Sequence, residues 1–218
     1  MNMVELLLIR HGQASFGAEN YDQLSDLGRQ QSRALGKTLR DIDWRPDRVI
    51  TGSLQRQKQT YEEMGFPVFA EEDPGWNEYD FNDLLHSRFG GQAPTEVIQD
   101  RKTHFRALKE TLAQWQRGGI TNAKESWESF CNRVEAARKQ AIRDGAERVL
   151  VISSGGVIAR LTAHALGVPD AQMITLNLQI RNSAVTRFIA SQDRFFLNEF
   201  NSVPHLSKAE TMPLISYS

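Results

Sequence analysis

Short apolar runs alternate along this chain with segments of helical periodicity. Three runs, at residues 4–9, 47–51 and 148–152, are short enough for buried strands, and each leads into a turn of polar residues or glycine. Strands that alternate with helices are typical of α/β folds, in which helices cover both faces of a largely parallel sheet. The pattern therefore predicts a three-layer αβα sandwich with a mostly parallel central sheet.

Helix signals lie between the predicted strands. Ser25 is the predicted N-cap of a first helix, whose basic residues point mostly toward water. Ser53 is predicted to cap a second helix over residues 54–64, which places Arg56 in its first turn. A third, apolar helix is predicted over residues 157–166. The second and third helices thus begin directly after a strand end.

Residues 66–126 interrupt this alternation. Residues 66–69 are predicted to form a strand, and residues 95–117 have helical periodicity. Because a helical excursion between sheet strands is a natural lid, we expect a helical lid insertion at approximately residues 80–126. The candidates for lining its pocket, taken as a group, are Trp76, His86, Arg88, Phe89, His104 and Arg106.

Length and charge narrow the class of protein. The 218 residues contain no Gly/Ser/Pro-rich linker, repeat or low-complexity stretch, so we expect a single domain over residues 1–218, with a C-terminal tail at 207–218. Lys and Arg number 26 against 27 for Asp and Glu, a formal net charge of −1. This balance does not indicate nucleic acid or an anionic membrane surface as a partner.

Cysteine usage and the apolar runs indicate the compartment. The single cysteine, Cys131, cannot form an intramolecular disulfide, and its neighbours suit the packed face of an amphipathic helix. The N-terminal residues lack the basic region of a signal peptide, and no apolar run approaches the length of a membrane span. The expected location is the cytoplasm. The five histidines are scattered and form no Cys/His cluster, so metal ligation is not predicted.

The first predicted strand ends in residues that can carry chemistry. Arg10, His11 and Gly12 directly follow its apolar run. In open α/β sheets, ligands bind at the carboxyl ends of the strands. A histidine at this edge can act as nucleophile, acid or base, and the adjacent arginine indicates an anionic ligand. For the tripeptide alone, a hydrogen-bonded surface histidine beside a solvated arginine is the alternative.

Polar residues recur at the other two strand ends. If the strands are parallel neighbours, one pocket collects the side chains and amides of Arg10, His11, Ser53, Arg56, Ser154 and Gly155. Two arginines, a hydroxyl and the N–H groups of a helix N-terminus form a receptor for a phosphoryl group. The sequence therefore predicts a phosphate pocket at this edge.

Five motifs occur in order over nearly all of residues 4–206. They are LIRHGQ at residues 8–13, LSDLG at 24–28, SLQR with QT at 53–60, NEYDF at 77–81 and NSVPHL at 201–206. In these motifs the chain resembles the histidine phosphatase superfamily, also called the phosphoglycerate mutase-like family. The resemblance implies a phosphoglycerate mutase-like αβα fold with a mixed sheet edge, and insertions that shape the substrate pocket.

One position departs from the family pattern. The family usually has a second histidine, in a pattern like Ser-His-Gly-Gly-Val-Ile, and Ser154 stands at the position that matches it. In the family this histidine donates to the phosphoryl oxygens, a role in which a hydroxyl is a shorter and neutral substitute. Loss of one such donor costs roughly 2.7 to 4 kcal/mol, or about a hundred- to a thousand-fold in rate. The departure predicts a slow or specialised enzyme.

The resemblance also implies a covalent mechanism. His11 attacks phosphorus to give a phosphohistidine, which water hydrolyses, while Arg10 and Arg56 disfavour the imidazolium and screen the phosphate. Glu78 matches the family's acid position and is the predicted proton donor and later base. An exposed acidic turn that contains Glu78 is the alternative for this carboxylate. The predicted phosphate-binding set is Arg10, Gly12, Gln13, Ser53, Arg56, Ser154 and Gly155.

The predicted function is hydrolysis of a phosphomonoester without metal or cofactor, with inorganic phosphate as product. The expected partner is a phosphorylated small molecule or a phosphoprotein, and the sequence indicates no oligomeric state. Two other functions stay open. A non-catalytic phosphate-ligand binding or regulatory module fits the substitution at Ser154, and a phosphoglycerate mutase-type isomerase fits the same pocket.

Overall fold

The computed structural model describes residues 3–15, 22–92, 94, 101–143 and 145–217. Its strands are β1 (Val4–Arg10), β2 (Arg48–Thr51), β3 (Ala70–Glu72), β4 (Arg148–Ser153), β5 (Val185–Ala190) and β6 (Phe195–Ser202). Its α-helices are α1 (Asp26–Asp41), α2 (Gln55–Met64), α3 (Phe81–Arg88), α5 (Arg101–Gln116), α6 (Trp127–Ala141), α7 (Gly155–Leu166) and α8 (Ala171–Asn177). Short 3₁₀ turns lie at Pro74–Trp76, Pro204–Leu206 and Met212–Leu214.

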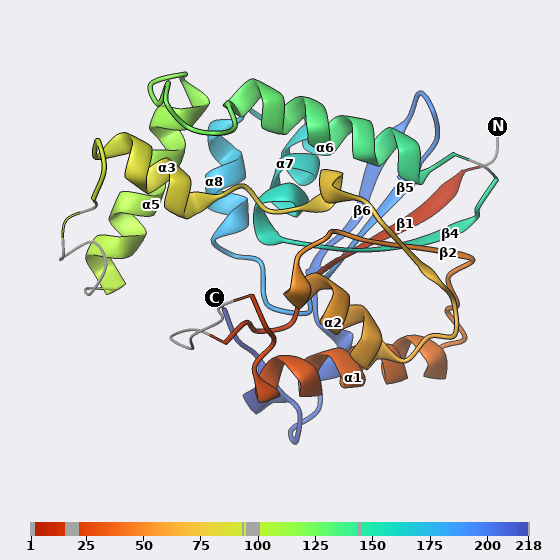
Figure 1. Ribbon diagram of the computed structural model, residues 1–218. Helices are drawn as coiled ribbons and strands as arrows, with labels where there is room; N and C mark the ends of the chain where they lie inside the picture. The colour runs from red at the N-terminus through yellow and green to blue at the C-terminus, as the bar shows by residue number, and fades with distance from the viewer. Residues whose placement is uncertain (1–2, 16–21, 93, 95–100, 144, 218) are drawn as a thin grey trace.

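The strands form one six-stranded sheet in the order β3-β2-β4-β1-β5-β6 (Figure 1). β1 pairs in parallel with β4, and β2 pairs in parallel with both β4 and β3. β5 is antiparallel to both of its neighbours, β1 and β6. The parallel core predicted from the alternation of strands and helices is confirmed, and so is the mixed edge.

Alternation of side chains along β1 builds a core on each face of the sheet. Leu6 and Leu8 pack with residues of α6, α7 and α8, whereas Leu7 and Ile9 pack with residues of α1 and α2. In Figure 1, α1 and α2 accordingly lie on one side of the sheet and α6 and α7 on the other. The predicted three-layer αβα arrangement is confirmed.

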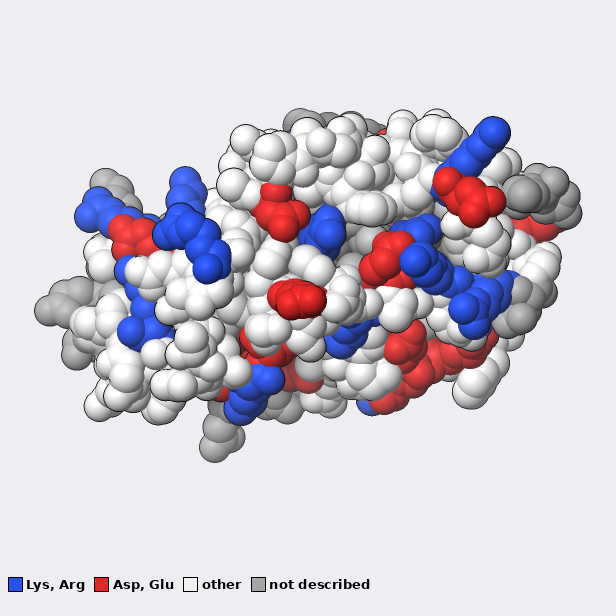
Figure 2. Space-filling view, turned by 90° about the horizontal axis from the view of Figure 1, so that it is seen from above, with Lys and Arg blue, Asp and Glu red and all other residues white. Residues whose placement is uncertain are grey.

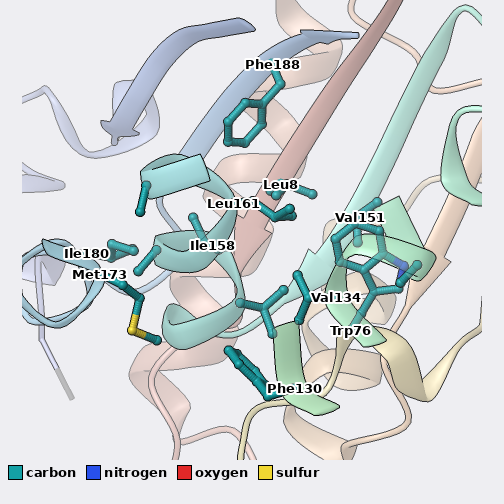
Figure 3. Close-up of a cluster of buried hydrophobic side chains, with 14 of the residues drawn as sticks. Leu8, Trp76, Phe130, Val134, Val151, Ile158, Leu161, Met173, Ile180 and Phe188 are labelled. Atoms are coloured by element: carbon teal, nitrogen blue, oxygen red, sulfur yellow. The ribbon is translucent and has the colours of Figure 1, made fainter. Parts of the chain in front are cut away.

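The larger core lies between the sheet and α7, and it corrects one sequence prediction. In Figure 3, Leu8, Val151 and Phe188 of the sheet face Ile158 and Leu161 of α7. Trp76, predicted to line a substrate pocket, lies in this core and is fully buried (Figure 3). A large apolar ring packed in this core stabilises the fold.

The strand predicted at residues 66–69 lies a few residues further on, at β3. Pro67 has no N–H to give to a sheet ladder, and the hydroxyl of Tyr61 donates to the carbonyl of Val68 at 2.5 Å. Phe69 is 86% exposed and contributes nothing to the core. The segment is therefore a connection, and β3 pairs with β2 only from Ala70 onward.

One of the two predicted helix caps is confirmed, and the other is wrong. Ser25 caps α1 as predicted, since its Oγ accepts from the N–H of Gly28 at 3.1 Å. Ser53 does not cap α2, which has Leu54 at the N-cap position. Instead, Asp22 Oδ2 accepts from the N–H of Gln55, the first residue of α2, at 2.8 Å. A carboxylate from another segment thus replaces the local serine.

The segment predicted as a lid contains α3 and α5, which pack on each other at one end of the molecule (Figure 1). The described part of the predicted helix begins at Arg101, and residues 95–100 lie outside the described residues. Tyr79 and Trp115 join this segment to the main core, where their ring centroids lie 5.4 Å apart.

Surface charge is mixed on the face seen in Figure 2. Lys and Arg side chains alternate there with Asp and Glu, and no large area of one sign is visible. Within the ranges that the structure describes, none of the helices is both long and apolar enough to span a membrane.

Candidate active site

The strand ends meet as predicted. Arg10 at the end of β1 is paired in register with Ser153 at the end of β4, and the N–H of His11 donates to the carbonyl of Ser153 at 3.0 Å. On the other side, the N–H of Ser183 donates to the carbonyl of His11 at 3.2 Å. The backbone of His11 is therefore held by the end of β4 and by the segment that precedes β5, and its side chain lies at the carboxyl edge of the parallel core.

The imidazole of His11 is buried and has a defined tautomer. Its Nδ1 lies 2.7 Å from the carbonyl oxygen of Gly12, and because a carbonyl can only accept, Nδ1 carries the proton. Nε2 then carries the lone pair, and Arg56 Nε–H donates to it at 3.1 Å. Burial, followed by the charges of Arg56 and Arg10, holds the pKa of His11 well below its ordinary value of 6.5. The ring is therefore neutral at physiological pH.

Two guanidinium groups flank this ring. Arg56, from the first turn of α2, contacts His11 and also forms an ion pair with Asp22, with 2.6 Å between Nη1 and Oδ1. Arg10 is buried, and its Nη1 donates to the carbonyl of Ile180. Both positive groups are thus fixed in place by other parts of the chain and lie close enough to His11 to affect its protonation.

Glu78 lies against the N-terminus of α7. Its Oε2 accepts from the N–H of Gly156 at 2.9 Å, and a Cβ at Gly156 would come within 2.2 Å of Oε1, so only glycine leaves room for the carboxylate. Burial raises the pKa of Glu78 above its ordinary value of 4.5, although the Gly156 N–H and the charges of Arg56 and Arg10 oppose the shift. A proton is therefore retained on this carboxyl group more readily than in water.

The acidic-turn alternative for Glu78 does not describe these contacts. Asp80 caps α3 by accepting from the N–H of Asp83, and Asp83 Oδ2 accepts from the N–H of Lys124 at 2.8 Å. These two carboxylates serve the segment of α3, whereas Glu78 faces α7.

Ser154 is the N-cap residue of α7 and is fully buried. Its Oγ does not cap the helix but accepts from Gln57 Nε2 at 2.9 Å. Gly155 is the first residue of α7, so helix geometry leaves its N–H without an intrahelical acceptor. A Cβ at Gly155 would lie 3.6 Å from Arg10 Nε, which places this helix end beside the arginine.

Three of the predicted phosphate ligands have their backbone N–H groups bonded to other residues. The N–H of Gly12 donates to Thr60 Oγ1, that of Gln13 to Gln31 Oε1 and that of Ser53 to Asn77 Oδ1, at 3.0, 3.0 and 2.8 Å. Asn77 Nδ2 also donates to Ser53 Oγ at 2.7 Å, which leaves the serine's own proton for another acceptor. These contacts shape the loops, and they remove the main-chain amides of these residues as phosphate donors.

The lid candidates are dispersed. Arg88 donates to the carbonyl of Ala107 and pairs with Glu110, so it holds α3 to α5. His86 and Arg106 are exposed. Phe89 packs under the guanidinium of Arg88 and against the small cluster of α3 and α5. The side chain of His104 lies outside the part that the structure describes.

The sequence analysis missed four residues that shape the site: Asp22, Gln57, Tyr79 and Asn177. Asn177 Nδ2 donates to the hydroxyl of Tyr79 at 3.0 Å, and a Cβ at Gly155 would come within 2.4 Å of Asn177 Oδ1. The pair therefore forms a polar wall beside Glu78 and the N-terminus of α7. Only the motif that contains Tyr79 offered a signal, because the other three residues carry no local pattern.

Among the described residues, no group of three or more His, Cys, Asp or Glu side chains is arranged to hold a metal ion. Cys131 lies in α6, half-buried, with Arg160 Nε donating to its Sγ at 3.1 Å. Burial raises the pKa of its thiol, which is the opposite of what a nucleophilic cysteine needs.

A neutral histidine between two arginines, with a carboxyl group of raised pKa nearby, is an arrangement that can support phosphoryl transfer. Residues 6–203 match the model of the histidine phosphatase superfamily (branch 1), and the chain belongs to this family.

Individual proteins are also similar to this chain in sequence or in fold. A 2,3-bisphosphoglycerate-dependent phosphoglycerate mutase from Chelativorans sp. (strain BNC1) is 34% identical over 90 residues, and the match spans 36% of this chain and only 44% of that protein. The solved structure named mycobacterial hydrolase 2 superposes with a TM-score of 0.70 at 19% identity, over 98% of this chain and 97% of its own. A phosphoserine phosphatase from Entamoeba histolytica, in complex with phosphoserine, has a TM-score of 0.67 at 17% identity, over 93% and 99% of the two chains. These structures share the fold.

Proposed function

We propose that the protein is a metal-independent phosphomonoester hydrolase that works through a phosphohistidine on His11. One observation carries the proposal: the Nδ1 proton of His11 is bound to the Gly12 carbonyl, and the Nε2 lone pair faces Arg56. A nucleophilic histidine must be neutral, with a lone pair available to the reacting group. The bond from Nδ1 supports the first condition, and a phosphoryl group that draws Arg56 away from Nε2 would supply the second.

The first step forms a bond between His11 Nε2 and phosphorus and breaks the bond from phosphorus to the leaving oxygen. A phosphoryl group offers its oxygens to Arg56, whose guanidinium then leaves the Nε2 lone pair free to attack. Arg10 and the N–H of Gly155, which lie near each other, bind the equatorial oxygens. Charge that builds on these oxygens in the transition state is thereby stabilised.

Glu78 completes both steps by moving one proton. Its raised pKa supplies the protonated carboxyl group that an alkoxide leaving group needs. In the second step the resulting carboxylate takes a proton from water, which attacks phosphorus as the bond to Nε2 breaks. Inorganic phosphate leaves, and His11 and Glu78 return to their starting protonation states.

The test is hydrolysis of an aryl phosphate and of a panel of phosphorylated metabolites, with and without chelator, followed by acid-labile phosphoenzyme trapping. Wild type should release phosphate and label His11. His11→Ala should lose turnover and labelling while it still binds inorganic phosphate weakly, because Arg10 and Arg56 remain. Wild-type turnover in the His11→Ala protein would remove His11 as the nucleophile.

The same experiment separates the two other functions. A binding module binds phosphate but hydrolyses no member of the panel. The partial likeness to a phosphoglycerate mutase favours the isomerase as second candidate. An isomerase would transfer the phosphoryl group from His11 back to a retained phosphoglycerate. This transfer would be detected as a bisphosphorylated intermediate.

A further inference from the structure

Ser154 and Gln57 form a buried pair next to His11, and the proposed reaction gives this pair no role. We infer that Gln57 is a positioning residue that aims the hydroxyl of Ser154 at the phosphoryl group. The inference rests on the proposed phosphatase function. Both side chains are fully buried, and Gln57 Nε2 donates to Ser154 Oγ at 2.9 Å.

The neighbours of the pair in sequence place it at the pocket. The N–H of His11 donates to the carbonyl of Ser153 at the end of β4, and Ser154 is the next residue and the N-cap of α7. Gln57 follows Arg56 on α2, and Arg56 donates to Nε2 of His11. Each member of the pair is therefore one residue away from a residue that bonds to His11.

The hydrogen bonds of Ser154 indicate what its hydroxyl proton can bind. A serine hydroxyl donates one proton and accepts at its lone pairs, and Gln57 occupies an acceptor position. Within the described residues, the Ser154 proton has no acceptor at hydrogen-bond distance, and Ser154 makes no N-cap bond. A phosphoryl oxygen supplies the missing acceptor.

Gln57 itself cannot donate to a ligand. One of its amide protons goes to Ser154 and the other to the carbonyl of Trp76 at 3.1 Å, while its Oε1 accepts from the N–H of Leu54 at 3.3 Å. A Cβ at Gly52 would come within 2.0 Å of Oε1, so the strand end leaves room for this amide only because it has glycine there. Gln57 can therefore affect catalysis only through its hydrogen bond to Ser154.

The same packing explains why a serine fits at this position. The amide of Gln57 lies against Ser154 Oγ, so an imidazole at residue 154 that extended in the direction of this hydroxyl would have to displace it. A histidine there and a glutamine at residue 57 thus compete for one volume in a closely packed core.

The first test is a double-mutant cycle with Ser154→Ala, Gln57→Met and the combined variant. Methionine preserves the length of glutamine but donates nothing, and the Trp76 carbonyl keeps a donor in Ser153 Oγ at 2.7 Å. Each single variant should lower kcat for an aryl phosphate by about ten-fold or more with little change in KM, because the donor acts in the transition state. The combined variant should be no slower than either one.

Glu62→Met is the matched control, since Glu62 is exposed on the same helix, and its kcat should equal that of wild type. A purely structural Gln57 would lower the free energy of unfolding and reduce kcat by the same factor with or without the Ser154 hydroxyl. That additive result would overturn the inference. If Gln57→Met does not fold, an unchanged kcat in Ser154→Ala alone also overturns it.

The second test asks whether a histidine at residue 154 competes for space with Gln57. Ser154→His alone should lower the thermal midpoint and leave kcat at or below the wild-type value. Adding Gln57→Ala should restore the midpoint and raise kcat about ten-fold or more above that of Gln57→Ala. An equal gain from Ser154→His without the second substitution would show that the two residues do not compete for space.

Phosphoenzyme trapping separates this inference from the proposed function. A wild type that hydrolyses no phosphomonoester and labels no histidine overturns both. A wild type that labels His11, combined with additive effects of Gln57→Met and Ser154→Ala, leaves the phosphatase in place and overturns only the role of Gln57.

Discussion

Arg56 Nε and His11 Nε2 lie 3.1 Å apart, and the contact joins the candidate nucleophile to a phosphate-binding cation. The contact fixes the ring from one side while the Gly12 carbonyl fixes it from the other. The same guanidinium helps to hold the pKa of His11 below its ordinary value. In the proposed reaction it also binds the phosphoryl group that His11 attacks, so Arg56 would couple substrate binding to release of the Nε2 lone pair.

Replacing Arg56 with lysine should test this coupling. Lysine keeps the positive charge but lacks the planar fork that can contact His11, Asp22 and a phosphoryl oxygen together. We expect kcat to fall by about a hundred-fold or more, with a smaller loss of phosphate affinity. Steady-state kinetics and phosphate titration measure the two effects.

Arg29→Lys is the matched control, because Arg29 pairs with Glu63 at the surface between α1 and α2. Its kcat should be unchanged, because lysine keeps the charge that pairs with Glu63 and Arg29 has no part in the proposed reaction. Retention of wild-type kcat in Arg56→Lys would show that charge alone suffices at residue 56.

Glu78→Gln should distinguish leaving groups. The amide cannot supply a proton to an alkoxide, whereas a nitrophenolate leaves without one. Turnover of alkyl phosphates should therefore fall far more than turnover of an aryl phosphate, by about a hundred-fold against a few-fold. The measurement is kcat for a series of substrates whose leaving groups differ in pKa, and equal losses across the series would remove Glu78 from the acid role.

The pH dependence of kcat should reflect both groups. Because the pKa of His11 lies well below 6.5, the neutral imidazole persists as pH falls through 6.5, and kcat should drop only at lower pH. The pKa of Glu78 is raised above 4.5, so kcat for an alkyl phosphate should also decline as pH rises through that raised value and the proton is lost. Glu78→Gln should abolish the alkaline decline. Its persistence in the variant would assign this limb to another group.

The strand ends were predictable because their signals are local. An apolar run that stops at Arg10 and His11 marks a buried strand and its edge, and the glycines after Ser154 mark a helix start. The three-layer arrangement with a mostly parallel sheet follows from the alternation of strands and helices. These elements depend on neighbours in sequence, and the structure confirms them.

The supporting contacts were not predictable because they are distant in sequence. Gln57 meets Ser154 across 97 positions and Arg56 meets Asp22 across 34. A glutamine inside a polar helix does not differ in pattern from an exposed one, so its burial emerges only from packing. The prediction of a strand at residues 66–69 was wrong for a local reason: Pro67 has no N–H for a sheet ladder, and the Tyr61 hydroxyl donates to the carbonyl of Val68.

A buried histidine away from the pocket gives the last prediction. His205 is 5% exposed, and its Nε2 lies 2.8 Å from the hydroxyl of Ser183, the residue that holds the His11 carbonyl. Burial lowers the pKa of His205 from 6.5 to about 4. Between pH 6.5 and about 4, the unfolded chain therefore binds a proton at His205, whereas the folded chain does not.

The sign of the effect follows from that difference. The contribution of His205 to stability is fully present above pH 6.5, declines as pH falls toward 4 and is constant below, a loss of about 3 kcal/mol in the free energy of unfolding. His11 acts in the same direction, so the test compares wild type with His205→Gln, which retains a polar group near Ser183 but does not titrate. Denaturant unfolding at a series of pH values should show the difference between the two proteins shrinking as pH falls from 7 to 4. A constant difference would mean that His205 is protonated in the folded protein at about the same pH as in the unfolded chain.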